Sequence, residues 1–227
     1  LNRESDKVLV HEGVPGGVAL IVSLLLYAAA IVLGVVLAWI ATPWVIPIGA
    51  ASMAVGFLYT GGPLPISRTP AGEFFAGGFL GWVLITLTIV TLAPGATTGE
   101  DLLVGIPSFL FVASILTVNN TCDIEGDTKS GRRTLSILLG RRGGEILVYA
   151  LGGGAFATAA FLAVAGILPR GVLVGSGATA IAALPVYRGL HRRGFSHETK
   201  GASMAAISKA FLLFSAGIGI PLGIYAV

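Results

Sequence analysis

The chain has 227 residues, of which 55% are hydrophobic and 11% are charged, and its mean hydropathy is +0.90. Soluble domains carry about 25% charged residues, so this composition excludes an ordinary soluble fold and indicates a membrane protein. The formal net charge is +3, but the cations occupy short loops between apolar runs and form no aromatic-rich basic face, which argues against a nucleic-acid partner. A single cysteine, Cys122, excludes an internal disulfide.

Seven apolar stretches follow one another along the chain, each roughly 17 to 25 residues long as a bilayer requires. They predict an all-α fold, a polytopic transmembrane helical bundle. No repeat of fixed period is present, and glycines scattered through the spans favour close helix packing, so residues 1–227 are expected to form one domain. Turn-forming Gly and Pro residues, among them Gly143-Gly144 and Gly194, separate the spans. The expected spans are 18–41, 43–59, 74–92, 103–120, 144–168, 171–187 and 204–226.

The cations are divided unequally between the two sides of this predicted bundle. Because successive loops alternate sides, twelve of the fourteen Lys and Arg residues fall on one side, in the N-terminal segment and the loops 60–73, 121–143 and 188–203. The positive-inside rule makes that side cytoplasmic, and we expect a multi-pass protein of the plasma membrane. Polar groups that open on one side favour chemistry on cytoplasmic metabolites over a channel or transporter, which more often places them at mid-membrane.

The most polar stretch, residues 119–142, reads NNTCDIEGDTKSGRRTLSILLGRR and holds three of the eleven acids and five of the fourteen cations. Asn119, Asp123 and Asp127 recur every fourth residue, so on a helix they would lie on one face about one turn apart. Magnesium prefers oxygen ligands and often takes only one or two carboxylates, with substrate phosphates completing its shell. Acids that begin where an apolar span ends must be solvated, paired or metal-bound. The stretch therefore predicts a Mg²⁺ site.

Cations follow these acids directly. A mixed site of carboxylates with Lys129, Arg132 and Arg133 suits a metal-bridged diphosphate, in which the cations bind the remaining phosphate charge. The alternative is that the acids are ordinary loop carboxylates neutralised by these neighbours. For Arg141 and Arg142, control of membrane topology explains the charge as well as ligand binding does.

Four other polar residues have both a structural and a functional interpretation or lie near the polar loops. Glu73 begins a span, where it either favours a helix N-terminus or lines a substrate pocket. Lys209 lies within an apolar span, where an unpaired ammonium is costly, so it either extends toward the 188–203 loop or contacts substrate. His191 and His197 have no metal-ligand spacing and are expected to be solvated.

These motifs resemble those of the UbiA superfamily of intramembrane prenyltransferases. Its second aspartate-rich motif is similar to Asn119-xxx-Asp123-xxx-Asp127 followed by Lys129, Gly131, Arg132, Arg133, Thr134, Leu135 and Gly140. A loop of the 1,4-dihydroxy-2-naphthoate branch is similar to Tyr59-Thr60-Gly61-Gly62-Pro63-Leu64-Pro65 with Thr69-Pro70-x-Gly72-Glu73. The doubled Asn119-Asn120 points to the same branch, and weak similarity covers most of the chain as far as Ser208-Lys209.

The resemblance implies a bundle of about nine spans in which two aspartate-rich motifs face each other across a cytoplasmic cavity, where Mg²⁺ holds a polyprenyl diphosphate. Ionisation of the allylic C–O bond would precede attack by an aromatic acceptor, 1,4-dihydroxy-2-naphthoate, with loss of its carboxylate, in menaquinone biosynthesis. The expected partners are thus the lipid bilayer, the diphosphate and the acceptor. Together with the residue chemistry, the resemblance assigns Asp123, Asp127 and Asn119 to the metal, with the two aspartates catalytic; Lys129, Arg132, Arg133 and Arg68 to the diphosphate; and Asn119, Asn120, Tyr59, Glu73 and Lys209 to the substrate pocket.

The chain departs from the family pattern in three places. The first aspartate-rich motif and two spans are absent, and residues 1–15 resemble the loop after that motif, so we expect missing N-terminal spans or a partner chain to complete the metal site. Cys122 stands where the branch usually has Arg, and a thiol cannot replace that charge at neutral pH. Arg68 stands where Tyr is common. The alternatives are a UbiA-type enzyme with another acceptor, and a non-catalytic membrane transporter or lipid-binding protein.

Overall fold

Helices form all the regular structure of residues 15–93 and 95–225, the part of the chain that the computed structural model describes. Residues 1–14, with the N-terminal cations Arg3 and Lys7 and nearly all of the segment that resembles the loop after the first motif, lie outside that part. The elements are α2 (Gly16–Ile40), α3 (Val45–Thr60), η1 (Ile66–Arg68), α4 (Gly72–Ala76), η2 (Gly77–Val83), α5 (Leu84–Leu92), η3 (Glu100–Leu103), α6 (Ile106–Cys122), α7 (Ile124–Lys129), α8 (Leu135–Val164), α9 (Gly171–Arg193) and α10 (Lys200–Tyr225).

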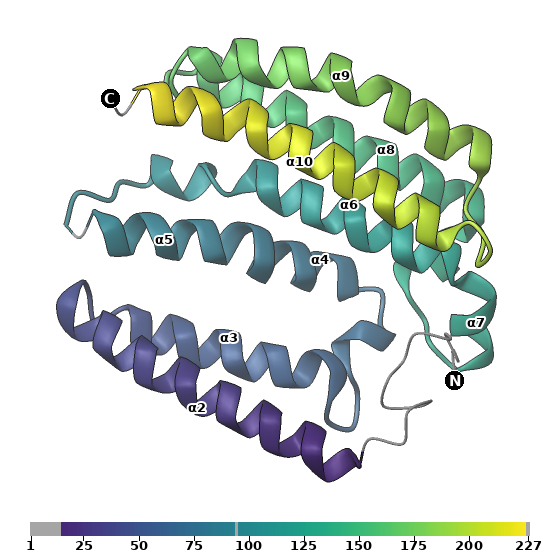
Figure 1. Ribbon diagram of the computed structural model, residues 1–227, viewed down its shortest axis with the longest axis horizontal. Coiled ribbons are helices and arrows are strands. Elements are labelled where there is room, and N and C mark those ends of the chain that lie inside the picture. Colours follow the sequence, from purple (N-terminus) through teal and green to yellow (C-terminus); the bar gives the residue numbers. More distant parts are fainter. Residues whose placement is uncertain (1–14, 94, 226–227) are drawn as a thin grey trace.

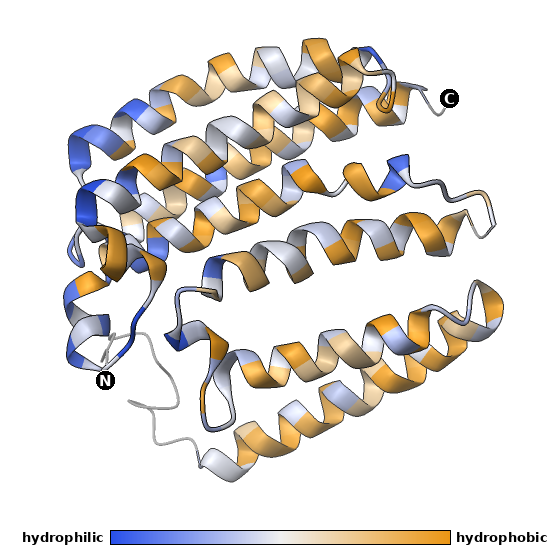
Figure 2. Cartoon of the chain, turned by 180° about the vertical axis from the view of Figure 1, so that it is seen from behind, coloured by the Kyte–Doolittle hydropathy of each residue, from blue (hydrophilic) through white to orange (hydrophobic). Residues whose placement is uncertain are grey.

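The predicted all-α membrane bundle is confirmed. Six helical segments are long and apolar enough to cross a bilayer, the α4–η2–α5 run counting as one of them, and α3 is a seventh, shorter apolar helix. In Figure 1, helices α6, α8, α9 and α10 lie together, α2 and α3 lie at the opposite side, and α4–α5 lies between the two groups. Hydrophilic residues gather at the end of the molecule that holds α7 and the start of α10 (Figure 2).

The core sits among α6, α8, α9 and α10. Phe111 of α6 is fully buried, and its ring centroid lies 4.8 Å from that of Phe214 and 5.8 Å from that of Phe156. Such aromatic pairs add about 0.5 to 1.5 kcal/mol each beyond area burial. Helix α2 has no buried residue and packs against α3, so apolar lipid is the natural environment for most of its surface.

Two glycines bring η2 against α6. A Cβ on Gly77 would lie 2.6 Å from the carbonyl oxygen of Phe109, and one on Gly81 would lie 2.6 Å from the Phe109 Cα, so any larger residue would separate the helices. The π-helical turn of η2 is of a kind that often occurs near functional sites. This close packing places the start of α4 beside the end of α6.

Several predicted boundaries were wrong in the polar loops. The expected 121–143 loop contains α7 and the first turns of α8. The backbone breaks at Gly140, whose φ is 69°, and Gly143-Gly144 lies inside the helix. Gly144 serves packing, because a Cβ there would lie 2.9 Å from Cγ2 of Thr121 and overlap its hydroxyl. The expected 188–203 loop shrinks to residues 194–199.

Candidate active site

The aspartate-rich stretch is two helices with a break between them. Helix α6 ends at Cys122, and Asp123, with φ −100° and ψ 10°, lies between it and α7. The hydrogen-bond spacing nevertheless continues, because the Asp123 N–H donates to Asn119 O at 3.2 Å and the Asp127 N–H donates to Asp123 O at 2.8 Å. Both aspartates are buried, with 5% and 4% exposure. The fourth-residue spacing thus survives the break, and both acids are withdrawn from bulk water.

Asp123 is held by the start of α10 and the loop before it. Its Oδ2 lies 2.6 Å from Nζ of Lys200, and its Oδ1 lies 3.3 Å from Nδ1 of His197. The expectation that His197 is solvated holds for about half of its side chain, which is 53% exposed, but the ring also contacts a carboxylate of the candidate site. The sequence places Lys200 only among the cations of the 188–203 loop. No spacing in the sequence signals either contact, since both join residues more than 70 positions apart.

Internal hydrogen bonds order the 194–199 loop that carries His197. The Thr199 hydroxyl donates to Gly194 O at 3.0 Å, and the Ser196 hydroxyl donates to Glu198 Oε2 at 2.6 Å. The Ser196 hydroxyl, followed by the Glu198 backbone N–H, lowers the pKa of the Glu198 carboxyl from its usual value near 4.5. The loop therefore presents His197 and Lys200 from a fixed backbone.

Arg141 ties this loop to the aspartate-rich stretch. Its guanidinium donates to the carbonyl of Phe195 and to the carboxylate of Glu125 on α7. Topology control was one explanation for this charge, and the structure adds a direct structural contact that joins α7, α8 and the loop.

Asp127 faces the arginines that follow α7. Arg132 Nη1 lies 3.4 Å from Asp127 Oδ1. Arg68 donates from Nη2 to Ser130 O at 3.2 Å, and the Arg133 N–H donates to Arg68 O at 2.8 Å. The loop before α4 is therefore docked on the turn after α7, which brings two segments of the predicted diphosphate site together.

Several of the predicted site cations are exposed. The side chains of Lys129 and Arg133 are exposed at this end of the molecule. Lys209 lies on an exposed face of α10 and does not line the apolar cavity that α3, α5 and α6 form beside the site. Cys122 is fully buried in the hydrophobic core, so the position that usually carries Arg in the naphthoate branch is here part of the packing.

On the other side of α6, Glu73 and Asn120 form a buried pair. Asn120 Nδ2 donates to Glu73 Oε1 at 2.9 Å, and Asn119 Nδ2 in turn donates to Asn120 Oδ1 at 3.4 Å. The Tyr59 hydroxyl lies at the start of α4, 3.9 Å from where a Cβ on Gly72, the residue before Glu73, would lie. Four predicted pocket residues are thus neighbours of one another and of the aspartate-rich stretch.

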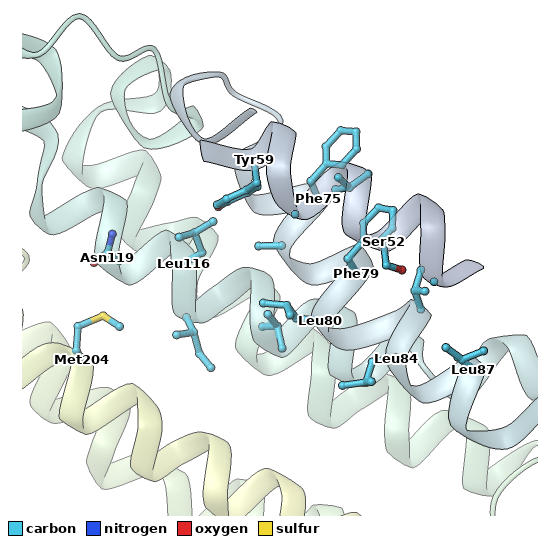
Figure 3. Close-up of a pocket in the computed structure, with 17 residues that line it drawn as sticks. Ser52, Tyr59, Phe75, Phe79, Leu80, Leu84, Leu87, Leu116, Asn119 and Met204 are labelled. Atoms are coloured by element: carbon cyan, nitrogen blue, oxygen red, sulfur yellow. The ribbon is translucent and has the colours of Figure 1, made fainter. Parts of the chain in front are cut away.

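An apolar cavity of about 790 Å³ opens beside these residues. Figure 3 shows Asn119 and Tyr59 toward one end and Leu84 and Leu87 toward the other. The volume falls within the ∼300–1,000 Å³ typical of ligand pockets. Helices α3, α4, η2, α5 and α6 form it with Met204 of α10, and the lining is Gly49, Ser52, Val55, Gly56, Tyr59, Phe75, Ala76, Phe79, Leu80, Val83, Leu84, Leu87, Val112, Ile115, Leu116, Asn119 and Met204.

The donor set at the polar end fits a hard divalent cation. Asp123 and Asp127 supply buried carboxylates one turn apart, Asn119 supplies an amide oxygen, and these are the ligand types that Mg²⁺ prefers. Among the described residues no group of three or more His, Cys, Asp and Glu side chains gathers, so the protein ligands available here are few and substrate oxygens would complete the shell. Lys200 and Arg132 balance the two carboxylates in this structure.

Comparison with known proteins matches residues 2–226 to the UbiA prenyltransferase family. The chain is 39% identical to the 1,4-dihydroxy-2-naphthoate octaprenyltransferase of Bacillus subtilis over 142 residues, which are 63% of this chain and 45% of that relative. The enzyme of the same name from Mycobacterium tuberculosis is 33% identical over 135 residues, 60% of this chain and 42% of the relative. The matches therefore span less than half the length of these relatives.

A solved structure shares the fold. The apo structure of a UbiA homolog from Aeropyrum pernix K1 superposes with a TM-score of 0.71 at 20% identity, covering 98% of this chain and 78% of that one. At that identity the likeness establishes the helical arrangement alone.

Proposed function

The chain belongs to the UbiA prenyltransferase family, and from that premise we propose that it transfers a polyprenyl group from a polyprenyl diphosphate to 1,4-dihydroxy-2-naphthoate, a step of menaquinone biosynthesis. One observation carries the proposal. The buried Asp123, with its neighbour Asp127, lies one helical turn from Asn119. Asn119 lines an apolar cavity that extends along about two turns of α6 to the first turn of α5. The diphosphate group of the substrate would bind at the polar residues, and its prenyl tail would bind against the apolar lining of the cavity.

The polar end is suited to the diphosphate. Asp123, Asp127 and Asn119 would hold Mg²⁺, which when bound supplies positive charge that stabilises the departing diphosphate. Lys200 and Arg132 lie at the carboxylates and are available to bind phosphate oxygens once the carboxylates hold the ion. Arg68, on the docked loop, adds a third cation. Preorganised charge of this kind, directed at the leaving group, is a major source of rate enhancement.

The cavity is suited to the tail and to the reactive carbon. Its lining is almost entirely apolar between Tyr59 and Leu87, so burial of an isoprenoid chain would contribute about 25 cal/mol for each Å² removed from water. A dry site also protects an electron-deficient allylic carbon from attack by water. Tyr59, Asn119 and the Glu73–Asn120 pair lie at the junction of the two regions, where the acceptor ring would bind.

We place this site on the cytoplasmic side of the plasma membrane. The support is the gathering of hydrophilic residues at the α7 end of the molecule (Figure 2), together with the excess of cations in the loops of that side. Both substrates' polar groups would then enter from the cytoplasm, while the prenyl tail enters from the bilayer.

Membranes that contain the full-length protein test the proposal. With Mg²⁺, 1,4-dihydroxy-2-naphthoate and a polyprenyl diphosphate they should form a decarboxylated, prenylated naphthalenediol, detected by mass spectrometry. An acceptor panel with 4-hydroxybenzoate and an alcohol separates the naphthoate assignment from a UbiA-type enzyme with another acceptor. Absence of product with every acceptor would favour a non-catalytic membrane protein.

The metal assignment has its own test within the same assay. Asp123→Asn and Asp127→Asn should each abolish most turnover, and Glu125→Gln, the same type of change at an exposed acid between them, should not. Normal turnover in both aspartate variants would show that these carboxylates do not hold the ion.

A further inference from the structure

Glu73 is a buried carboxylate for which diphosphate binding provides no role. It is the second residue of α4, it is 3% exposed, and its Oε1 accepts the 2.9 Å hydrogen bond from Asn120. Its Oε2 is also buried and accepts no hydrogen bond from residues 15–93 or 95–225. Burying a carboxylate is costly unless it is paired and hydrogen-bonded. Burial of a neutral side chain at position 73 would cost less free energy, so the presence of a carboxylate here requires an explanation.

An ionised carboxylate can only accept hydrogen bonds, whereas an amide can present either its oxygen or its NH₂ group. Glu73 therefore fixes the orientation of the Asn120 amide, whose NH₂ must face Glu73 and whose Oδ1 must face away. Asn120 Oδ1 in turn accepts from Asn119 Nδ2 at 3.4 Å. The orientation of the second amide thus follows from the first, and Asn119 Oδ1 is the atom that remains for a ligand.

We propose that Glu73 is a positioning residue that acts through Asn120 to present the Asn119 amide oxygen, rather than its NH₂ group, to the divalent ion. The inference rests on the proposed function, because it takes Asn119 as a metal ligand beside Asp123. An amide NH₂ cannot ligate a cation, so a flipped Asn119 would remove one ligand. Partners beyond the first ligands commonly change metal affinity about 10- to 100-fold.

The geometry of the chain provides a reversible test. In Glu73→Gln, the amide at position 73 can itself donate a hydrogen bond across the 2.9 Å contact, so the Asn120 amide can turn its oxygen toward position 73 and its NH₂ group toward Asn119. The Asn119 oxygen would then accept from Asn120, and the Asn119 NH₂ group would face the ion. In the double variant Glu73→Gln with Asn120→Asp, the new amide at position 73 donates to the new carboxylate at position 120. The second oxygen of that carboxylate again accepts from Asn119 Nδ2, so the Asn119 oxygen is presented as in the wild type.

The measurement is Mn²⁺ binding to the full-length protein in lipid nanodiscs, followed by electron paramagnetic resonance without acceptor or diphosphate, since Mn²⁺ shares the oxygen preference of Mg²⁺. We expect Glu73→Gln to raise the Mn²⁺ dissociation constant at least about tenfold and the double variant to return it to within about threefold of wild type. Glu145→Gln is the matched control, because Glu145 also accepts an internal hydrogen bond, from Tyr149 at 2.9 Å on α8, and it should leave Mn²⁺ binding unchanged.

Melting temperatures of the same samples separate positioning from folding. Recovery of the melting temperature without recovery of Mn²⁺ affinity in the double variant would assign the pair a structural role and overturn the proposal. Unchanged affinity in Glu73→Gln, or a wild-type protein that binds no Mn²⁺, would overturn it as well. If the wild type binds Mn²⁺ as expected yet does not prenylate 1,4-dihydroxy-2-naphthoate, the acceptor assignment fails and the positioning role stands.

Discussion

Replacing Asp123 by Asn separates the structural contribution of its carboxylate from the catalytic one. The side chain is 5% exposed and pairs with Lys200, whose side chain is 18% exposed, at 2.6 Å. Removing one partner of a buried ion pair costs about 3–5 kcal/mol. The other partner of Asp123, the His197 imidazole, is 53% exposed and is solvated when the carboxylate is lost. The expected loss of unfolding free energy is therefore near the lower end, about 3 kcal/mol.

Two measurements on one preparation check this value. Denaturant titration in mixed micelles gives the free energy of unfolding, and prenyl transfer under conditions where the variant is folded gives the activity, which should fall about 100-fold or more if a ligand of the ion is lost. Glu125→Gln is the control, because its carboxylate is 60% exposed and exposed pairs contribute at most about 1 kcal/mol. An Asp123→Asn protein as stable and as active as the Glu125→Gln control would refute the reasoning.

Three further outcomes are expected. Gly144→Ala should destabilise the bundle by about 1–3 kcal/mol, measured by the same denaturant titration, because the new methyl would overlap the Thr121 side chain; a neutral effect would mean that α6 and α8 can separate freely. Leu84→Trp narrows the far part of the cavity, so kcat/KM should fall more for long than for short prenyl diphosphates in a chain-length series, and an equal fall for all lengths would contradict tail binding there. Ser196→Ala should raise the pKa of the Glu198 carboxyl toward its usual value, because the hydroxyl hydrogen bond that lowers this pKa is lost. The stability that the bond contributes is present above the pKa of Glu198 in the unfolded chain and is lost as pH falls through its pKa in the folded protein. NMR titration of the carboxyl in both proteins measures the shift, and equal pKa values would mean that the bond is absent in solution.

The local part of the candidate site was predictable because it depends on helical spacing. Asn119, Asp123 and Asp127 recur every fourth residue, and backbone hydrogen bonds preserve that spacing even though α6 ends at Cys122. The salt bridge from Arg132 to Asp127 is likewise local in the chain. Such contacts follow from short-range geometry, which the sequence expresses directly.

The contacts across the bundle were not predictable in the same way. Lys200 reaches Asp123 from 77 positions away, and Asn120 reaches Glu73 across 47 positions. The sequence assigns both Glu73 and Asn120 to the substrate pocket, but nothing in their spacing indicates a hydrogen bond between them. Gly144 had been interpreted as a turn residue, and only the approach of Thr121 shows that it is needed for packing.

The sequence by itself determined that this protein is a helical membrane bundle with its polar chemistry at one end. Runs of about 20 apolar residues have no other stable arrangement in a bilayer, where every backbone hydrogen bond must be made within the segment. The tertiary structure alone decided that Lys200 meets Asp123, that the cavity opens beside Asn119, and that Glu73 is linked to Asn119 through Asn120. Those results depend on how closely helices approach, which is set by side chains far apart in the chain.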